Sequence, residues 1–382
     1  MSKNNKLHLG LKSLRVKYMG QNVGVLALTN NKKVAFSYDK EWLINGFSIS
    51  PFSLPLEEKV FVPDNYHFDG LFGIFADSLP DAWGNLLLKR MLQEHGLGND
   101  VTILDRLALV GKNGMGALEY EPNYELGQQK ETDDLDYLSM QCQKILQAEY
   151  SEDLDMVYRM AGSSGGARPK ILTTIEDVDW MIKFPAHVDS KDIGKQEYDY
   201  SKCAIKCGIP MTETRLYPSG VCQGYFGTVR FDRIRENGKK RKVHMATAAA
   251  LLEADFRVPC MDYHTLMKLT RILTGENKTE VESVFRRMCF NVFSHNRDDH
   301  AKNFTFLYDA EGDKWQLSPA YDLTYSNTYF GEHTTSVDGN GVNPGEKELI
   351  NVGIQAGMTK QNCIEIMEQI KTVVQQELKK YI

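Results

Sequence analysis

The sequence predicts an α+β protein with two lobes, because strand-like segments come first and helix-like segments dominate the later part of the chain. With 382 residues, the chain is long enough for two or three domains and a sizeable core. It contains no internal repeat, and its strands and helices do not alternate regularly. A doubly wound parallel sheet is therefore not expected.

The amino-terminal region predicts a small β-rich subdomain. Residues 12–38 form three alternating apolar runs separated by turn residues, which indicates an antiparallel meander. Residues 51–63 contain several prolines, which are typical of an extended edge segment. Residues Asp77–Gly96 keep the apolar spacing of a helix, and Gly96 marks its end.

The remaining chain predicts a part that mixes strands with a helix and then a mainly helical lobe. A polar stretch at residues 125–150 is expected to be a connection, with 127–136 as the linker. A hairpin (170–175 with 177–186), a helix (195–208) and further strands (213–233) follow. Helices are then expected at Met245–Leu252, Asp262–Leu273, Glu280–Phe293 and Lys360–Ile382. The predicted domains are residues 1–125, 126–235 and 236–382. The last helix is expected to pack on the helical lobe.

Composition and charge exclude some classes of protein. The hydrophobic fraction is 42% and the charged fraction 25%, both ordinary for a globular protein. The net charge of −6 argues against a nucleic-acid grip along the whole chain. The basic run Arg233–His244 is expected to be a solvated hairpin that turns at Gly238. The seven cysteines form no CxxC pair, and no apolar run of 18 residues occurs, so we expect a reduced, cytoplasmic protein without a membrane span.

The stretch "FSHNRDDHAKNFTF", from Phe293 to Phe306, concentrates polar side chains between a helix-like and a strand-like run. Asp298 and Asn303 are five residues apart, as are the substrate-facing aspartate and the Mg²⁺-binding asparagine of a protein-kinase catalytic loop. Asp299 adjoins Asp298, and the spacing favours Asp298. Asp322 follows a later strand-like segment and suits the second metal-binding carboxylate. Lys302 is placed to stabilise charge on a transferring phosphoryl group.

Two upstream features complete the requirements of phosphoryl transfer from ATP. The segment "AGSSGGARPK" is rich in glycine, so its backbone amides can approach an anion closely. Lys183 lies in an apolar strand, where alternation places it opposite Ile182 and Phe184. A lysine in that setting needs an anionic partner, and an ATP phosphate is one. These features occur in the chain order of a kinase.

Two hydrolase hypotheses compete with the kinase hypothesis. The letters G-x-S-x-G in the same loop match a nucleophile elbow with Ser164, but an elbow follows a strand and precedes a helix. Here the loop follows a helix-like run and precedes a strand-like one. A metal-dependent hydrolase would use His295, Asp298, Asp299 and His300, but no further histidine pair lies at ligand spacing.

The motifs "GSSGGARPK", "MIKFP", "VRFDR", "NRDDHAKNF" and "PAYDL" together resemble the HipA family of serine/threonine-protein kinases. The resemblance runs nearly end to end, since "VKYMGQNVGVL" and "FDGLFGIFADSLPDAWGNLLLKR" are similar to the family's amino-terminal subdomain. It implies a bilobal protein-kinase-like fold with a small β-rich amino-terminal subdomain and a mainly helical carboxyl-terminal lobe.

The resemblance also implies roles for individual residues. Asp298 would be the catalytic aspartate, with Asn303 and Asp322 as Mg²⁺ ligands. The expected ATP-binding residues are Ser163, Ser164, Gly165, Gly166, Ala167, Lys183, Arg230, Phe231, His300 and Lys302. Autophosphorylation in the Gly-rich loop is expected at Ser163, with Ser164 second. A phosphoserine there would repel the phosphates of ATP and inactivate the enzyme.

Members of the resembled family are toxins of bacterial toxin–antitoxin systems. The resemblance therefore implies a protein substrate such as an aminoacyl-tRNA synthetase or another translation factor. It also implies a small helix-turn-helix antitoxin of the HipB type, through which DNA would be bound. The alternative is a catalytically weak kinase-fold protein that serves as a subunit of an antitoxin–DNA repressor complex.

Overall fold

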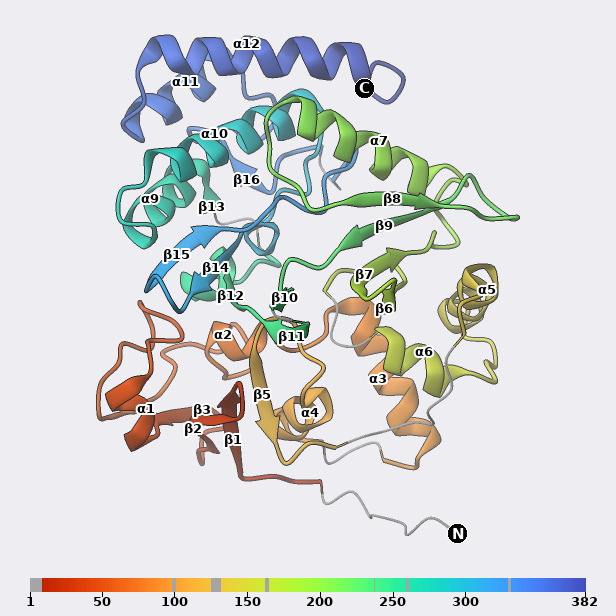
Figure 1. Ribbon diagram of the computed structural model, residues 1–382, viewed down its shortest axis with the longest axis vertical. Coiled ribbons are helices and arrows are strands. Elements are labelled where there is room, and N and C mark those ends of the chain that lie inside the picture. The colour runs from red at the N-terminus through yellow and green to blue at the C-terminus, as the bar shows by residue number, and fades with distance from the viewer. Residues whose placement is uncertain are drawn as a thin grey trace. The chain divides into compact units, whose positions relative to one another are not determined.

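The computed structural model describes residues 9–97, 101–124, 132–161, 165–236, 238–258, 261–328 and 331–382. The chain divides into two compact units, whose helices and strands are labelled in Figure 1. Unit 1 comprises Met1–Asp189 and Asp232–His244, and unit 2 comprises Ser190–Phe231 and Met245–Ile382. The mixture of helices and sheets is the predicted α+β class. The three-part division at residues 125 and 235 stays a prediction.

Unit 1 begins with an antiparallel sheet of order β4-β3-β2-β1-β5. Its strands are β1 (Ser13–Tyr18), β2 (Gln21–Leu28), β3 (Val34–Tyr38), β4 (Val60–Phe61) and β5 (Leu118–Glu121), and α1 (Lys40–Asn45) follows β3. The predicted meander is confirmed, and β4 is the expected edge strand. A Cβ on Gly24 would lie 2.2 Å from the carbonyl oxygen of Ser37, so the pairing of β2 with β3 needs a glycine there.

The helices of unit 1 are α2 (Gly73–Ala76), α3 (Ala82–Glu94), α4 (Ile103–Val110), α5 (Leu135–Leu146) and α6 (Leu154–Ala161). The predicted helix over Asp77–Gly96 is confirmed as α3, although it starts five residues later. The prediction of a connection over 125–150 is wrong for α5, which buries Leu138, Cys142 and Ile145 along one side. Residues 125–131 lie outside the described residues.

Two hairpins complete unit 1. Strands β6 (Lys170–Ile175) and β7 (Val178–Lys183) pair as predicted. Strands β10 (Arg233–Glu236) and β11 (Lys239–Lys242) form the expected hairpin over the basic run. Buried Asp232 accepts a hydrogen bond from the amide of Gly116 at 2.8 Å, and the Arg233 guanidinium donates to the carbonyls of Gly114 and Gly116. These bonds explain why 232–244 belongs to unit 1.

Unit 2 opens with α7 (Ile193–Lys206) packed on the hairpin of β8 (Thr214–Tyr217) and β9 (Tyr225–Val229). The predicted helix and strands are confirmed. A Cβ on Gly194 would lie 2.3 Å from the carbonyl oxygen of Gly224, so this glycine permits the close approach of α7 to the hairpin. The chain then leaves β9 through Arg230 and Phe231.

The rest of unit 2, which resumes at Met245 within β12, is mainly helical. Its elements are β12 (His244–Thr247), α8 (Ala248–Leu251), β13 (Met261–Asp262), α9 (Tyr263–Leu273), α10 (Lys278–Phe293), the 3₁₀ helix η1 (Ala301–Asn303), β14 (Thr305–Asp309), β15 (Lys314–Leu317), β16 (Thr335–Ser336), α11 (Glu346–Gln355) and α12 (Lys360–Glu377). The prediction of one helix over Met245–Leu252 is wrong in its first half. Residues 244–247 form a strand because they belong to the sheet β12-β14-β15.

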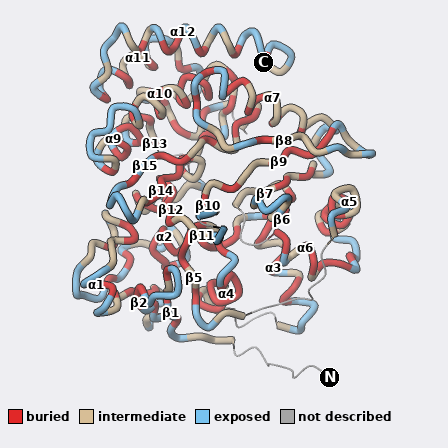
Figure 2. The backbone as a smooth tube through the Cα atoms, viewed as in Figure 1, coloured by how far each residue is buried: buried red, intermediate tan, exposed pale blue. Residues whose placement is uncertain are grey.

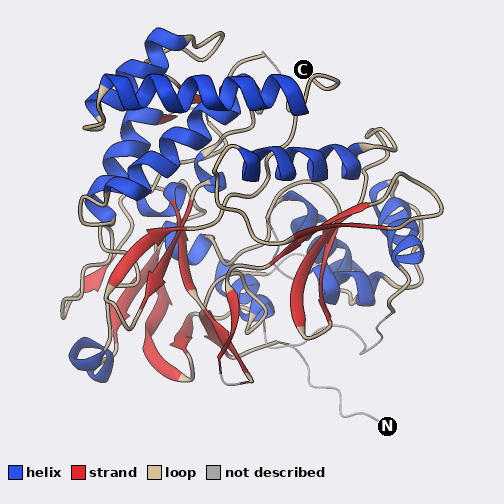
Figure 3. Ribbon diagram, turned by 45° about the horizontal axis from the view of Figure 1, so that its top comes forward, coloured by secondary structure: helices blue, strands red, loops and turns tan. Residues whose placement is uncertain are grey.

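The carboxyl-terminal helices form a cluster, which lies near the end marked C in Figure 3. Helix α12 packs on α10 and α11, as predicted. Figure 2 shows α12 with a buried side and an exposed side, and its buried residues are Cys363, Ile366, Met367, Ile370 and Val374. The cluster supports α10, and the end of α10 leads directly into the polar stretch of the predicted site.

Candidate active site

The Gly-rich loop lies between α6 and β6 in unit 1. The order is helix, loop and strand, as the sequence predicted, and this order is the reverse of a nucleophile elbow. Gly162, Ser163 and Ser164 lie outside the described residues, so the predicted phosphorylation sites stay predictions. The described part of the loop begins at Gly165.

The described part of the loop is held by hydrogen bonds. Gly166 has φ +87°, and its amide donates to the Asp81 carboxylate at 3.0 Å. Lys170 is buried, and its ammonium group donates to the carbonyl oxygen of Gly165. Beyond the glycines, Arg168 binds both carboxylate oxygens of Asp189. Ala167, the remaining predicted residue of this loop, is exposed.

Lys183 ends β7 and stands directly opposite Lys170 in the antiparallel register. Ile182 and Phe184 are buried on the opposite face, as the alternation predicted. Directly opposed residues of an antiparallel pair project from the same face, so two cationic side chains are neighbours here. Like charges in this arrangement are unfavourable by themselves.

In unit 2 the polar stretch forms the loop between α10 and β14. Asp298 and Asp299 have opposite environments in this loop. The side chain of Asp298 is 59% exposed, whereas that of Asp299 is fully buried. Asp299 accepts hydrogen bonds from the Tyr263 hydroxyl, His333 Nδ1 and the Thr335 amide. The residue favoured by spacing is thus the one that is accessible to a substrate.

Asn303 lies in η1, and its side-chain amide nitrogen donates to the carbonyl oxygen of Asp298 at 2.7 Å. That bond leaves the amide oxygen as the end that can bind a cation. Asp322 has φ +53°, a conformation that is uncommon outside glycine and frequent at functional sites. An amide oxygen and a carboxylate are hard oxygen donors, so the two side chains fit Mg²⁺.

Tyr321 joins the loop that carries Asn303 to the segment that carries Asp322. Its hydroxyl donates to the carbonyl oxygen of Lys302 and accepts from the hydroxyl of Thr305. Its ring lies 5.4 Å from the ring of Phe231, between ring centroids. Tyr321 therefore connects the loop, the segment before Asp322 and the residues that leave β9.

The remaining predicted residues of unit 2 lie around Phe256 or beside β9. The Phe256 ring is 5.7 Å from the His300 ring and 4.5 Å from the Lys302 ammonium, which is a cation–π contact. His300 Nε2 lies 3.8 Å from a carboxylate oxygen of Asp298. Arg230 is buried. The structure thus groups His300 and Lys302 on the Asp298 loop.

Sequence reasoning missed the residues that support the loop. Tyr263, His333 and Thr335 bind Asp299, and they come from α9 and from a segment more than thirty residues downstream. Nothing in their local sequence marks them. Tyr321 could have been noted, because it directly precedes Asp322 in "PAYDL".

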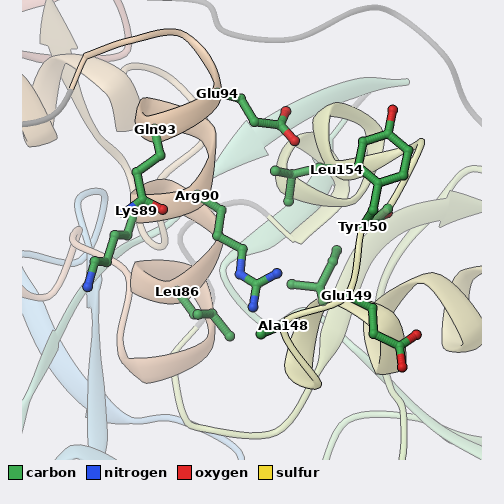
Figure 4. A pocket seen from close by; sticks show the side chains of 11 residues that line it. Leu86, Lys89, Arg90, Gln93, Glu94, Ala148, Glu149, Tyr150 and Leu154 are labelled. Atoms are coloured by element: carbon green, nitrogen blue, oxygen red, sulfur yellow. The ribbon is translucent and has the colours of Figure 1, made fainter.

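Of two cavities in the structure, one is lined by predicted site residues and the other is not. The larger, about 440 Å³, lies between α3 and the α5–α6 turn in unit 1, and Figure 4 shows the Arg90 guanidinium directed into it. None of the predicted site residues lines it. The smaller, about 10 Å³, is lined by Asn303 and Tyr321 and by the buried Arg287. Burial lowers the pKa of Arg287 to about 10, so its guanidinium remains charged at neutral pH.

The structure does not support the metal-dependent hydrolase hypothesis. Within the described ranges, no three His, Cys, Asp or Glu side chains are arranged to hold a metal ion. Asp299, one of the four residues of that hypothesis, is already engaged by three hydrogen-bond donors.

Comparisons with known proteins agree with this architecture. A family model for the HipA N-terminal domain matches residues 14–121, and one for the HipA-like C-terminal domain matches residues 162–378. The second model covers more than half of the chain. The α+β, kinase-like chain belongs to the HipA family.

Individual relatives are distant. A protein of Sinorhizobium fredii named putative kinase Y4mE is 23% identical over 345 residues, covering 83% of this chain and 78% of that protein. Putative kinase Y4dM of the same organism is 28% identical over 172 residues, covering 42% of this chain and 40% of that protein. The HipA chain of a Shewanella oneidensis MR-1 toxin–antitoxin complex with HipB and operator DNA has a TM-score of 0.71 at 16% identity, covering 96% of this chain and 90% of that chain. The Shewanella oneidensis HipA chain therefore has the same fold as this protein.

In the part of the chain that the structure describes, no helix is both long and apolar enough to cross a membrane.

Proposed function

We propose that the protein is an ATP-dependent serine/threonine-protein kinase and the toxin of a toxin–antitoxin pair. The observation that carries the proposal is the loop of unit 2 that contains the exposed Asp298. Asn303 binds the backbone of Asp298, and Tyr321, next to Asp322, binds the same loop at Lys302. The family membership and the names of the curated relatives support the same class of enzyme.

Each side chain has a role in the proposed reaction. Asp298 accepts the proton of the substrate hydroxyl. The hydroxyl oxygen then forms a bond to the γ-phosphorus of ATP, while the bond from that phosphorus to the bridging oxygen breaks and releases ADP. Asn303 and Asp322 would hold Mg²⁺, which neutralises phosphate charge when it is bound. Lys302 stabilises charge on the transferring group. Arg230, Phe231 and His300 complete the nucleotide contacts of unit 2.

The residues of unit 1 supply the proposed phosphate contacts. Lys183 and the amides of the Gly-rich loop other than that of Gly166, which donates to Asp81, would offer positive charge and donors to an anion. We propose Ser163, with Ser164 second, as the autophosphorylation site that inactivates the enzyme. A Ser163→Asp variant should then bind ATP more weakly than the wild type.

The test is intact-mass measurement after phosphatase-treated protein is incubated with Mg²⁺ and ATP, followed by peptide mapping. The wild type should gain one phosphate at Ser163 or Ser164, and Asp298→Asn should gain none. Asp309→Asn is the matched control, because Asp309 lies in β14 outside the site. Equal phosphorylation of Asp298→Asn would contradict the role of Asp298. No phosphate on any protein would favour the catalytically weak binding protein.

The partners are proposed from the family and the structural relative. The Shewanella oneidensis complex contains HipA together with HipB and its operator DNA. By analogy, a small HipB-type antitoxin would bind this protein, and DNA would be bound through that antitoxin. A translation factor such as an aminoacyl-tRNA synthetase is the proposed substrate.

A further inference from the structure

The residue directly before α3 does not act as a helix cap. Asp81 occupies the N-cap position, where an aspartate ordinarily accepts a hydrogen bond from an amide in the first turn of its own helix. Its side chain makes no such bond. Instead, its carboxylate accepts the amide of Gly166, 85 residues away, at 3.0 Å. The carboxylate is therefore used to hold the Gly-rich loop and not the helix.

The first turn of α3 contacts the loop at further points. The amide of Trp83 donates to the carbonyl oxygen of Gly166 at 3.2 Å, and its indole Nε1 donates to that of Lys170 at 3.3 Å. Trp83 is fully buried. A Cβ on Gly165 would lie 2.9 Å from an Asp81 carboxylate oxygen, so only glycine fits this close approach without movement. Both ends of the Gly165–Lys170 segment are thus attached to α3.

We propose that Asp81 is a positioning residue for nucleotide binding, acting through the backbone of the Gly-rich loop. The proposal rests on the kinase function proposed above. A glycine-rich segment has many accessible conformations, and fixing it before the phosphates arrive lowers the entropic cost of binding. A hydrogen bond from an amide to a carboxylate is charge-assisted and stronger than a neutral one. The subdomain that precedes the kinase core would in this way contribute to ATP affinity.

The variants for the test are Asp81→Ala, which removes the acceptor, and Asp81→Asn, which retains an oxygen acceptor without the charge. Asp39→Ala is the matched control. Asp39 is also an N-cap aspartate of unit 1, but its carboxylate caps its own helix through the amide of Glu41 at 2.9 Å. Thermal denaturation of each variant shows whether it is folded.

Two readouts are compared in full-length protein. The first is amide hydrogen exchange of a peptide that contains Gly166. The second is the Kd of a fluorescent ATP analogue with Mg²⁺, together with KM for ATP and kcat. We expect faster exchange and about tenfold weaker nucleotide binding in Asp81→Ala, a smaller effect in Asp81→Asn and none in Asp39→Ala. The change should appear in KM more than in kcat.

Other outcomes would overturn the proposal in distinguishable ways. Unchanged exchange in Asp81→Ala would show that the carboxylate does not hold the loop. Faster exchange with unchanged affinity for the ATP analogue would show that the Asp81–Gly166 bond holds the loop but does not contribute to nucleotide binding. Tighter binding would show that Asp81 competes with phosphate for the Gly166 amide. A wild-type protein that binds no nucleotide would instead overturn the proposed function itself.

Discussion

Asp298 and Asp299 divide two tasks between neighbouring residues. Asp298 is exposed on the loop, and the backbone carbonyl of the same residue orients Asn303. Asp299 turns inward and accepts bonds from Tyr263, His333 and Thr335. A buried carboxylate needs such donors because its desolvation is costly. The inner aspartate thus holds the position from which the outer one can act.

Replacing each aspartate by asparagine should separate these tasks. Asp299→Asn should lower the free energy of unfolding by about 2 kcal/mol, because three donors converge on a side chain that then has only one acceptor oxygen. Asp298→Asn should change it by less than about 0.5 kcal/mol, as expected at an exposed position, while abolishing phosphoryl transfer. Urea denaturation measures both. Equal destabilisation by the two changes would contradict the structural role of Asp299.

His244 should make the stability of the protein depend on pH. Its ring is buried, and Nε2 donates to the carbonyl oxygen of Ile49 at 2.9 Å. Burial lowers its pKa to about 4 from an ordinary value near 6.5. The unfolded state therefore binds a proton more readily than the folded state. The contribution of neutral His244 to the free energy of unfolding is therefore complete above pH 6.5. It is lost as the pH falls towards 4, by about 3 kcal/mol in total.

The comparison that isolates this effect is His244→Gln, whose side-chain amide can still donate to Ile49 but does not titrate. Urea denaturation at pH 7.5 and pH 4.5 should show a smaller loss of stability on acidification in the variant than in the wild type. An equal loss would assign the acid sensitivity to other groups.

At the scale of elements, the site is held by a few contacts between segments that have little regular structure. The Asp298 loop and the Ala320–Ser326 segment are joined by the Tyr321 hydroxyl and by the bond from the Ser326 amide to the His295 carbonyl. Helix α10 provides the base of this arrangement. Its buried Arg287 donates to the carbonyl oxygen of Ser318, just before the segment.

Tyr321→Phe removes only the hydroxyl group that joins the two segments. We expect kcat for phosphoryl transfer to fall about tenfold with a smaller change in KM for ATP, because misplacement of a catalytic group reduces the rate of the chemical step. The free energy of unfolding should fall by about 1 kcal/mol. Tyr308→Phe is the control, since its hydroxyl binds Asp313 in the β14–β15 turn. A tenfold loss in both variants would contradict the specific role of Tyr321.

At the scale of the whole molecule, the chain is acidic overall, and its most basic hairpin is neutralised locally. The net charge is −6, and the basic β10–β11 hairpin is paired with acidic side chains. Arg235 binds Asp177, Lys240 binds Asp179, Arg241 binds Glu236 and Lys242 binds Glu119. This hairpin is therefore a poor electrostatic surface for DNA phosphates.

We accordingly expect the isolated protein to bind DNA weakly. Fluorescence anisotropy with a duplex of mixed sequence, about 30 base pairs long, at about 0.15 M salt should give a Kd in the micromolar range or weaker, which is typical of non-specific binding. If the proposed HipB-type antitoxin exists, adding it together with its operator should produce tight binding. Nanomolar binding of the mixed duplex by the protein alone would contradict this interpretation.

The sequence by itself determined the elements whose signals are local. The strands of residues 12–38, the β6–β7 hairpin and helices α3, α9 and α10 follow from apolar periodicity and turn residues within each segment. The candidate residues Asp298, Asn303 and Asp322 follow in the same way from spacing and from the family motifs. Helix α4 could also have been predicted, because Thr102 and Asp105 form a capping box.

Only the tertiary structure decided the features that depend on distant partners. Residues 245–247 have the local pattern of a helix, and pairing within the β12-β14-β15 sheet makes them a strand. The inward turn of Asp299 depends on Tyr263 and His333, and the departure of Asp81 from helix capping depends on Gly166. Local sequence specifies backbone preference and apolar face, but the partner of a buried polar group is chosen when segments far apart in the chain pack together.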